Sequence, residues 1–197
     1  MYVEFQISRT GRQMCRRVKT VKKEEDGMRE DIIKKMEETS DYIFRNPELS
    51  LKEYKSSRAL ADFLGAEGFT VRWGIAGFET AFAAEWSNGH CKDELEESVQ
   101  AVNGSTEPIE PIEPIKPIEP VIGFLAEYDS LPGLGQECVS RQQQDGGPGH
   151  GCGHNLLGTA CAGAACELKD RMETENLPGT IRVYGCPAEE IVVGKIR

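Results

Sequence analysis

Residues 121–128 form a mostly apolar run, Val-Ile-Gly-Phe-Leu-Ala-Glu-Tyr, and this run constrains the fold more than any other segment. A continuous apolar strand, as opposed to one that alternates with polar residues, is typical of a strand buried on both faces. Strands of this kind occur in sheets that helices cover. We therefore expect an α/β domain with a strand at Val121–Tyr128 that is buried on both faces.

A first helix is predicted over residues 28–45. Ile32, Met36 and Ile43 recur there at helical spacing and would face a core. Pro47 ends the pattern, because the residue before a proline is pushed out of helical backbone geometry.

A second helix is predicted from Ser50 to about Ala66. Ser50 and Glu53 have the spacing of a capping box, in which each side chain bonds the backbone amide of the other residue. The side chains expected to point inward are Tyr54, Phe63 and Leu64.

Three further strands and one long helix complete the pattern. The strands are predicted at Phe69–Trp73, Thr80–Trp86 and Thr180–Tyr184. The helix, Leu156–Met172, is rich in Ala, Gly and Cys, with Asn155 as its expected cap. Small residues let this helix lie close to a sheet. The order of helices and strands along the chain predicts an α/β domain with a mixed sheet.

Two segments stand outside this pattern. Residues 1–23 carry seven Lys or Arg and one Glu, and we expect 1–27 to be a basic, disordered leader. A mitochondrial address is the alternative for this Arg-rich segment. Residues 87–120 form an insert, in which 108–120 place a proline at every third position, as in a polyproline II spacer. Docking of a proline-binding module is the alternative for the insert. The domain itself is predicted over 28–197.

The overall charge and hydropathy exclude two classes of partner. The formal net charge is −10, which argues against binding to the nucleic-acid backbone. No apolar run reaches the length of roughly 18 residues that a membrane helix needs, and the basic leader lacks the apolar core of a secretory signal. We expect a cytoplasmic protein with no nucleic-acid or membrane partner.

Metal-binding side chains cluster in His150-Gly-Cys-Gly-His154, which holds two of the chain's three histidines. Alternate side chains of an extended segment point the same way, and imidazole and thiolate are preferred ligands of zinc. The helix after this loop would aim its positive end at the loop and favour a thiolate on Cys152. A Cys152 nucleophile with His154 as its base is a weaker alternative, because nothing orients the base.

Acidic residues come after two of the predicted strands. Glu189 and Glu190 come after Gly185-Cys186-Pro187, and both can reach one site only if the chain leaves the sheet there. One of them could bind a metal ion while the other accepts a proton from water. Glu127 and Asp129 lie at the end of the strand at 121–128, where Asp129 is placed to orient a ligand histidine.

These segments together resemble one family of co-catalytic metallopeptidases and amidohydrolases. The family includes aminoacylases, hippurate hydrolases and auxin-conjugate hydrolases, and the branch most similar to this chain is that of aminobenzoyl-glutamate hydrolase-like amidohydrolases. The matching stretches are Ala126–Gly133, Gly149–Thr159 and Gly179–Glu190. The resemblance covers about residues 28–86 and 121–197.

The resemblance implies a zinc-peptidase-like catalytic domain and a role for each residue. Cys152, His154 and Glu190 match positions that bind two divalent metal ions, zinc or manganese. Glu189 matches the general base, and Asp129 and His150 match positions beside the metals that do not bind them. The implied reaction hydrolyses the amide bond of N-acyl amino acids, aminobenzoyl-glutamate or short peptides, in a full-length protein expected to be a homodimer.

The sequence departs from the family after Glu190. The family draws further histidine ligands and a small dimerisation domain from later in the chain, and no histidine comes after His154 here. Three ligands are too few for two metal ions. We therefore expect an incomplete, inactive N-terminal portion of the catalytic domain. The alternative is a non-catalytic protein that binds metal or a partner through the same fold.

Overall fold

The computed structural model of the chain describes residues 27–89, 119–137 and 146–192. Its elements, in chain order, are α1 (Glu30–Arg45), α2 (Tyr54–Ala66), β1 (Thr70–Trp73), the short 3-10 turn η1 (Ile75–Gly77), β2 (Phe82–Asn88), β3 (Val121–Glu127), α3 (His154–Thr174), β4 (Gly179–Cys186) and α4 (Glu189–Val192). Nearly all of the predicted leader, and most of the predicted insert, lie outside the described residues.

The strands form one mixed sheet in the order β1-β2-β4-β3. β2 pairs antiparallel with both β1 and β4, while β3 pairs parallel with β4 along its whole length. The connection from β3 to β4 runs through α3. The prediction of an α/β domain with a mixed sheet is therefore confirmed.

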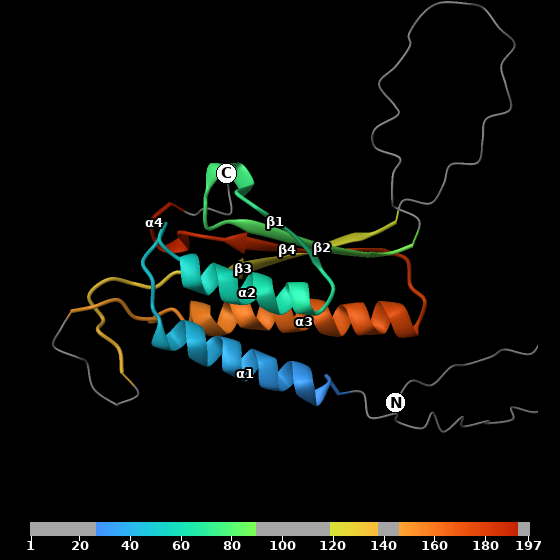
Figure 1. Cartoon of the computed structure of the whole chain (residues 1–197), viewed down its shortest axis with the longest axis horizontal. Coiled ribbons are helices and arrows are strands. Elements are labelled where there is room, and N and C mark those ends of the chain that lie inside the picture. Colours follow the sequence, from blue (N-terminus) through green and yellow to red (C-terminus); the bar gives the residue numbers. More distant parts are fainter. Residues whose placement is uncertain (1–26, 90–118, 138–145, 193–197) are drawn as a thin grey trace, which may run out of the picture.

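The three long helices all lie on one side of this sheet (Figure 1). α2 and α3 cover the sheet directly, and α1 packs on these two helices from outside. The core between the layers is built from apolar side chains of both, among them Ile181, Val183, Phe82, Ala126, Leu60 and Ala162. Burying them supplies most of the driving force for folding.

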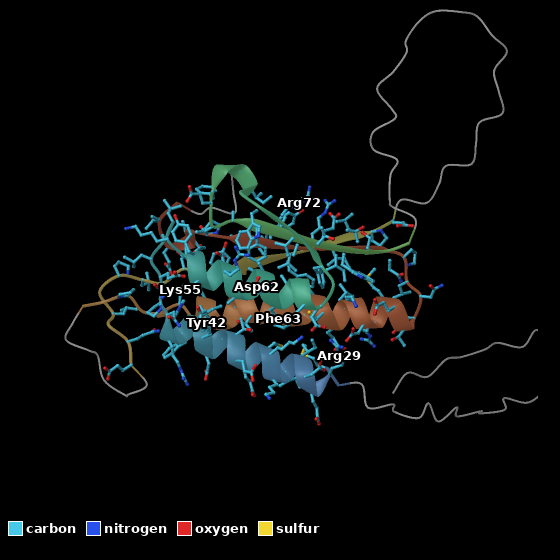
Figure 2. All side chains as sticks on the ribbon, in the orientation of Figure 1. Arg29, Tyr42, Lys55, Asp62, Phe63 and Arg72 are labelled. Atoms are coloured by element: carbon cyan, nitrogen blue, oxygen red, sulfur yellow. The ribbon has the colours of Figure 1, made fainter. Side chains whose placement is uncertain are left out.

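The prediction that the strand at 121–128 is buried on both faces is wrong. β3 is the last strand of the sheet within the described residues, and Val121 and Leu125 are 55% and 50% exposed. Both lie on the sheet face opposite the helices, as Arg72 does in Figure 2. The apolar run reflects burial on the helix side only, where Phe124 and Ala126 join the core.

The predicted start of the second helix is also wrong. α2 begins at Tyr54, and the hydroxyl of Ser50 donates 2.8 Å to Asp129 instead of capping the helix. Glu48 caps the helix instead, because its carboxylate accepts hydrogen bonds from the backbone amides of Lys55 and Ser56. Tyr54 was expected inward but is 55% exposed, whereas Phe63 and Leu64 are buried as predicted.

The small residues of α3 allow close packing, as predicted. A Cβ added to Gly158 would lie 2.5 Å from the backbone oxygen of Glu127, at the end of β3. The expected cap, Asn155, lies instead inside the helix and donates 3.0 Å to Ser40 of α1. Gly153 is the cap, with a left-handed backbone (φ 72°) that glycine adopts at no steric cost. No helix in the described ranges combines the length and apolar character needed to cross a membrane.

Candidate metal centre

Four chain segments converge at one edge of the sheet. β3 and β4 run parallel, so their carboxyl ends, at Glu127 and Cys186, meet at the same edge. In open α/β sheets this edge is the usual place for a site. α3 starts there at His154, and α4 starts there at Glu189, after the chain leaves the sheet at Pro187 as the sequence predicted.

His154 lies at the centre of this convergence and is only 5% exposed. Its Nδ1 lies 3.0 Å from Oδ1 of Asp129 and 3.1 Å from the backbone oxygen of the same residue. Its Nε2 lies 3.3 Å from Glu127 and 3.8 Å from Glu190. The hydrogen bond with Asp129 raises the pKa of His154, and burial opposes this shift.

Asp129, just after β3, links the starts of α3 and α4 with the segment between α1 and α2. Besides its contact with His154, Asp129 accepts two hydrogen bonds at Oδ2, one of 2.8 Å from the Ser50 hydroxyl and one of 3.0 Å from the Glu190 amide. Burial alone would raise the pKa of Asp129, but these hydrogen bonds outweigh it and hold the pKa below its ordinary value. An ionised Asp129 therefore orients the His154 ring and fixes the start of α4.

The side chains around His154 form two groups with the geometry of metal ligands. One group is Cys152, His154 and Glu190, and the other is Glu127, His154 and Glu189. Within each group the ligand atoms lie within 4.8 Å of one another. The structure thus brings together all three side chains that the sequence indicated as ligands, and Glu189 beside them.

The expected thiolate character of Cys152 is not found. Cys152 is exposed, and its hydrogen bond with Glu190, together with the charges of Glu189 and Asp129, raises the pKa of its thiol. These acidic neighbours oppose the thiolate that the positive end of α3 is expected to favour. The raised pKa also argues against the alternative in which Cys152 is a nucleophile, since a thiol with a raised pKa is a poor nucleophile.

His150 belongs to neither of the two ligand groups. Its backbone amide donates to the side chain of Gln136. Burial lowers the pKa of its ring, which faces the carbonyl of Ile43 without a hydrogen bond of ordinary geometry. His150 is nevertheless near enough to His154 and Asp129 for their charges to act on the pKa of its ring.

Glu127 is the site residue to which the sequence interpretation assigned no role. It is 8% exposed and lies on the strand position two before Asp129. The i, i+2 spacing at the end of β3 was a usable signal, because it predicts that both carboxylates lie on the same side of the strand.

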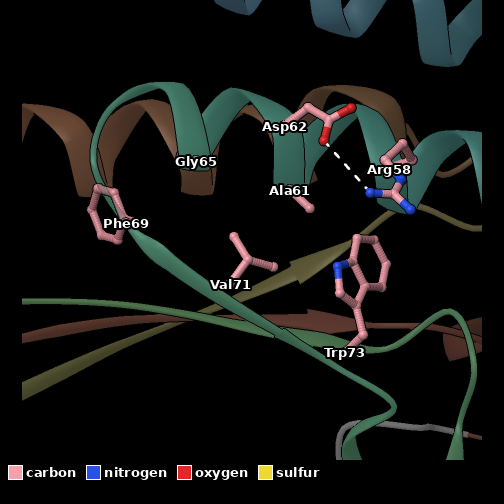
Figure 3. A pocket seen from close by; sticks show the side chains of 7 residues that line it. All are labelled: Arg58, Ala61, Asp62, Gly65, Phe69, Val71 and Trp73. Carbon is pink, nitrogen blue, oxygen red and sulfur yellow. Dashed lines mark ion pairs between the residues drawn. The ribbon is translucent and has the colours of Figure 1, made fainter.

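A separate hollow of about 350 Å³ lies between α2 and β1 (Figure 3). Its lining residues are Arg58, Ala61, Asp62, Gly65, Phe69, Val71 and Trp73. Arg58 lies 4.8 Å above the Trp73 ring and 3.8 Å from Asp62. None of the metal-ligand candidates lines this hollow, so it is distinct from the site at the carboxyl ends of β3 and β4.

Curated relatives match the chain in sequence, whereas no family model matches it. A p-aminobenzoyl-glutamate hydrolase subunit of Escherichia coli (strain K12) is 35% identical over 159 residues, which are 79% of this chain and 27% of that protein. The Xaa-Arg dipeptidase of Homo sapiens is 32% identical over 162 residues, or 78% of this chain and 29% of that protein. The chain thus spans less than a third of the length of these relatives.

Solved structures share the fold, and two of them are as follows. One is a dinuclear metal-binding peptidase of the M20 family from Bacillus subtilis, with a TM-score of 0.57, 22% identity, and coverage of 81% of this chain and 36% of that one. The other is described as an aminohydrolase from methicillin-resistant Staphylococcus aureus, with a TM-score of 0.57, 21% identity, and coverage of 82% and 34%. The sequence matches show that the described part of this chain is related to amidohydrolases and dipeptidases, and the solved structures share its fold.

Proposed function

We propose that this chain contributes the first half of a two-metal site that hydrolyses amide bonds. The observation that carries the proposal is the position of His154, which belongs to both ligand groups and is oriented by Asp129. A carboxylate that holds one ring nitrogen, so that the other faces a cluster of ligands, is the usual arrangement around a metal-binding histidine.

The donor set fits divalent metal ions. Cys152, His154 and Glu190 would hold one ion, and Glu127, with Glu189 beside it, would face the second. Oε1 of Glu190 is buried and accepts no hydrogen bond of ordinary geometry within the described part of the chain. A thiolate with an imidazole suits zinc, and a carboxylate-rich group also takes manganese.

Glu189 is proposed as the general base. When bound, divalent ions supply a Lewis acid that polarises a carbonyl and makes water more acidic. Glu189 lies at the start of α4, in the same ligand-distance group as His154, and a carboxylate there can accept a proton from attacking water and return it to the leaving amine. Glu190 and Cys152 keep the role of ligands.

The proposed substrates are N-acyl amino acids, aminobenzoyl-glutamate or dipeptides. The matched relatives support this class, because one is a p-aminobenzoyl-glutamate hydrolase subunit and the other is a dipeptidase. The predicted homodimer of the full-length protein and its cytoplasmic location stay predictions.

We further propose that residues 1–197 alone are inactive. The site gathers five ligand-capable side chains, which are Glu127, Cys152, His154, Glu189 and Glu190. One of them is reserved as base, and no histidine comes after His154 in the chain. Two complete metal shells then need ligands from elsewhere.

Hydrolysis assays of two protein lengths test this function. The 197-residue chain and a version extended by the reading frame beyond Arg197 are loaded with zinc or manganese and given the three substrate classes. We expect turnover only in the extended protein, and its loss in Glu189→Gln. An extended protein that is inactive with each substrate, although it binds two metal ions, would instead support a non-catalytic metal-binding role.

A further inference from the structure

Ala188, between Pro187 and the glutamate pair, has a left-handed backbone (φ 58°). A residue with a Cβ adopts this conformation only at an energetic cost, and it persists where surrounding contacts hold it. The bend turns the chain away from β4 and sets the direction in which α4 starts. Whatever holds Ala188 therefore also sets where Glu189 and Glu190 lie.

The contact that holds Ala188 is a buried carboxylate. The amide of Ala188 donates 2.9 Å to Oε1 of Glu53, a residue with no exposed surface. The same oxygen accepts 2.8 Å from the amide of Leu51, which is also left-handed (φ 67°). One oxygen atom thus ties two strained bends that lie 137 residues apart in the chain.

The same two segments also meet at Asp129. Ser50, next to Leu51, donates to Oδ2 of Asp129, and the amide of Glu190 donates to the same oxygen. Glu53 and Asp129 therefore clamp one pair of segments from two sides. Asp129 touches the His154 ring, whereas Glu53 acts on the site through the backbone amides of Ala188 and Leu51.

Both oxygens of Glu53 accept from neutral donors. Oε2 accepts 2.9 Å from the hydroxyl of Thr80, and the carbonyl of Thr80 accepts 2.7 Å from Tyr128. A buried carboxylate surrounded by neutral groups costs free energy, and burial correspondingly raises the pKa of Glu53. An apolar side chain would avoid this cost but would leave three donors without an acceptor.

We propose that Glu53 is a positioning residue for the metal site, which fixes Glu189 and Glu190 by holding the Ala188 amide. The metal in this proposal rests on the proposed function, whereas the hold of Glu53 on the Ala188 amide does not. What matters is the reach of the Glu53 acceptor and not its charge.

Three variants of Glu53 separate reach from charge. Glu53→Ala removes the acceptor. Glu53→Asp keeps the charge but shortens the side chain by one methylene, so that it no longer reaches Ala188. Glu53→Gln keeps the length and the oxygen that faces the two amides, while the Thr80 hydroxyl can reverse and accept from the new amide group.

Glu48→Ala is the matched control. Glu48, like Glu53, lies between α1 and α2, and its carboxylate accepts hydrogen bonds from the amides of Lys55 and Ser56 at the start of α2. Its loss removes a helix cap and costs stability without touching Ala188. Thermal unfolding of each variant identifies those that remain folded.

Cobalt(II) affinity of the full 197-residue chain is the first readout, measured by competition with a chelator. We expect Glu53→Ala and Glu53→Asp to weaken binding by about tenfold or more, as the loss of partners behind metal ligands does, with Glu53→Gln and Glu48→Ala close to the parent chain. The proposal is overturned if Glu53→Asp binds like the parent, or if Glu48→Ala weakens binding as much.

Hydrogen exchange of the backbone amides of residues 188–190 is the second readout, and it needs no metal. Exchange should be faster in Glu53→Ala and Glu53→Asp and unchanged in Glu53→Gln and Glu48→Ala. If the parent chain does not bind cobalt, the proposed function fails, and this readout still decides the role of Glu53. Unchanged exchange in both the alanine and the aspartate variant would overturn it.

Discussion

Asp129 and His154 are held together at two points, because Nδ1 of the His154 ring lies 3.0 Å from the Asp129 carboxylate and 3.1 Å from its backbone oxygen. This leaves Nε2 as the nitrogen that faces Glu127 and Glu190. The tautomer with a proton on Nδ1 is the one that can bind a cation through Nε2. The pair therefore prepares His154 as a ligand before any ion arrives.

Replacing the carboxylate tests this preparation. Asp129→Asn replaces one carboxylate oxygen with an NH2 group, which can only donate. This NH2 group then faces another donor, either the ring N–H of His154 or the Ser50 hydroxyl and the Glu190 amide. We expect zinc affinity to fall by about 10–100-fold, measured by chelator competition. Asp62→Asn, an exposed position on α2, is the control and should bind zinc like the parent chain.

The two adjacent glutamates are predicted to fail in different ways. Glu189→Gln should reduce turnover of an active, extended protein by roughly 10²–10⁴-fold while its metal content is retained, because a general base is lost. Glu190→Gln should lower the metal content itself. Metal analysis beside the rate measurement separates the two, and a loss of metal in Glu189→Gln would show that Glu189 is a ligand and not the base.

A pair of glycine variants tests the close packing that seats α3. Gly158→Ala would push a methyl group against the backbone oxygen of Glu127, and we expect it to destabilise the fold by about 1–3 kcal/mol. Gly65→Ala lies within α2, where an added Cβ meets nothing within 4 Å, and it should stabilise by roughly 0.5–1 kcal/mol. Urea unfolding gives both free energies. A neutral Gly158→Ala would contradict the packing described.

The pH dependence of stability depends on Glu53. Its pKa is raised by burial above the ordinary value of 4.5, so the folded chain favours the neutral carboxyl group. Its contribution is fully present below 4.5 and is lost as the pH rises through the raised value. Glu53→Gln cannot ionise, so its melting temperature should gain on that of the parent chain as the pH rises from about 4.5, and then level off. A constant difference across this range would contradict the pKa shift.

The order of helices and strands was predictable because it depends on local pattern. Ile32 and Ile43 repeat at helical spacing and are buried in α1, and the strand after Gly179 lies where β4 is found. The exposure of β3 was not predictable, because an apolar run indicates that a strand is buried on at least one face and not how many neighbours it has. Val121 and Leu125 would have the same sequence pattern in both cases.

The site was predictable where its residues are close in sequence and not where they are brought together by the fold. Cys152 and His154 are two residues apart, so their proximity follows from the sequence. Ser50 and Glu53 have the spacing of a local capping box, yet both side chains bond to segments more than 25 residues away. Tertiary hydrogen bonds outcompeted the local ones, and no local pattern indicates them.

Cobalt(II) titration of the chain, monitored by absorption, decides whether Cys152, His154 and Glu190 form a metal site. Binding through a thiolate gives a sulfur-to-cobalt charge-transfer band. We predict this band in the parent chain, its loss in Cys152→Ala, and weakened binding in His154→Ala and Glu190→Gln, with Cys161→Ala unchanged as the control thiol. A parent chain without the band, or a band that survives in Cys152→Ala, would contradict a metal site built on these three residues.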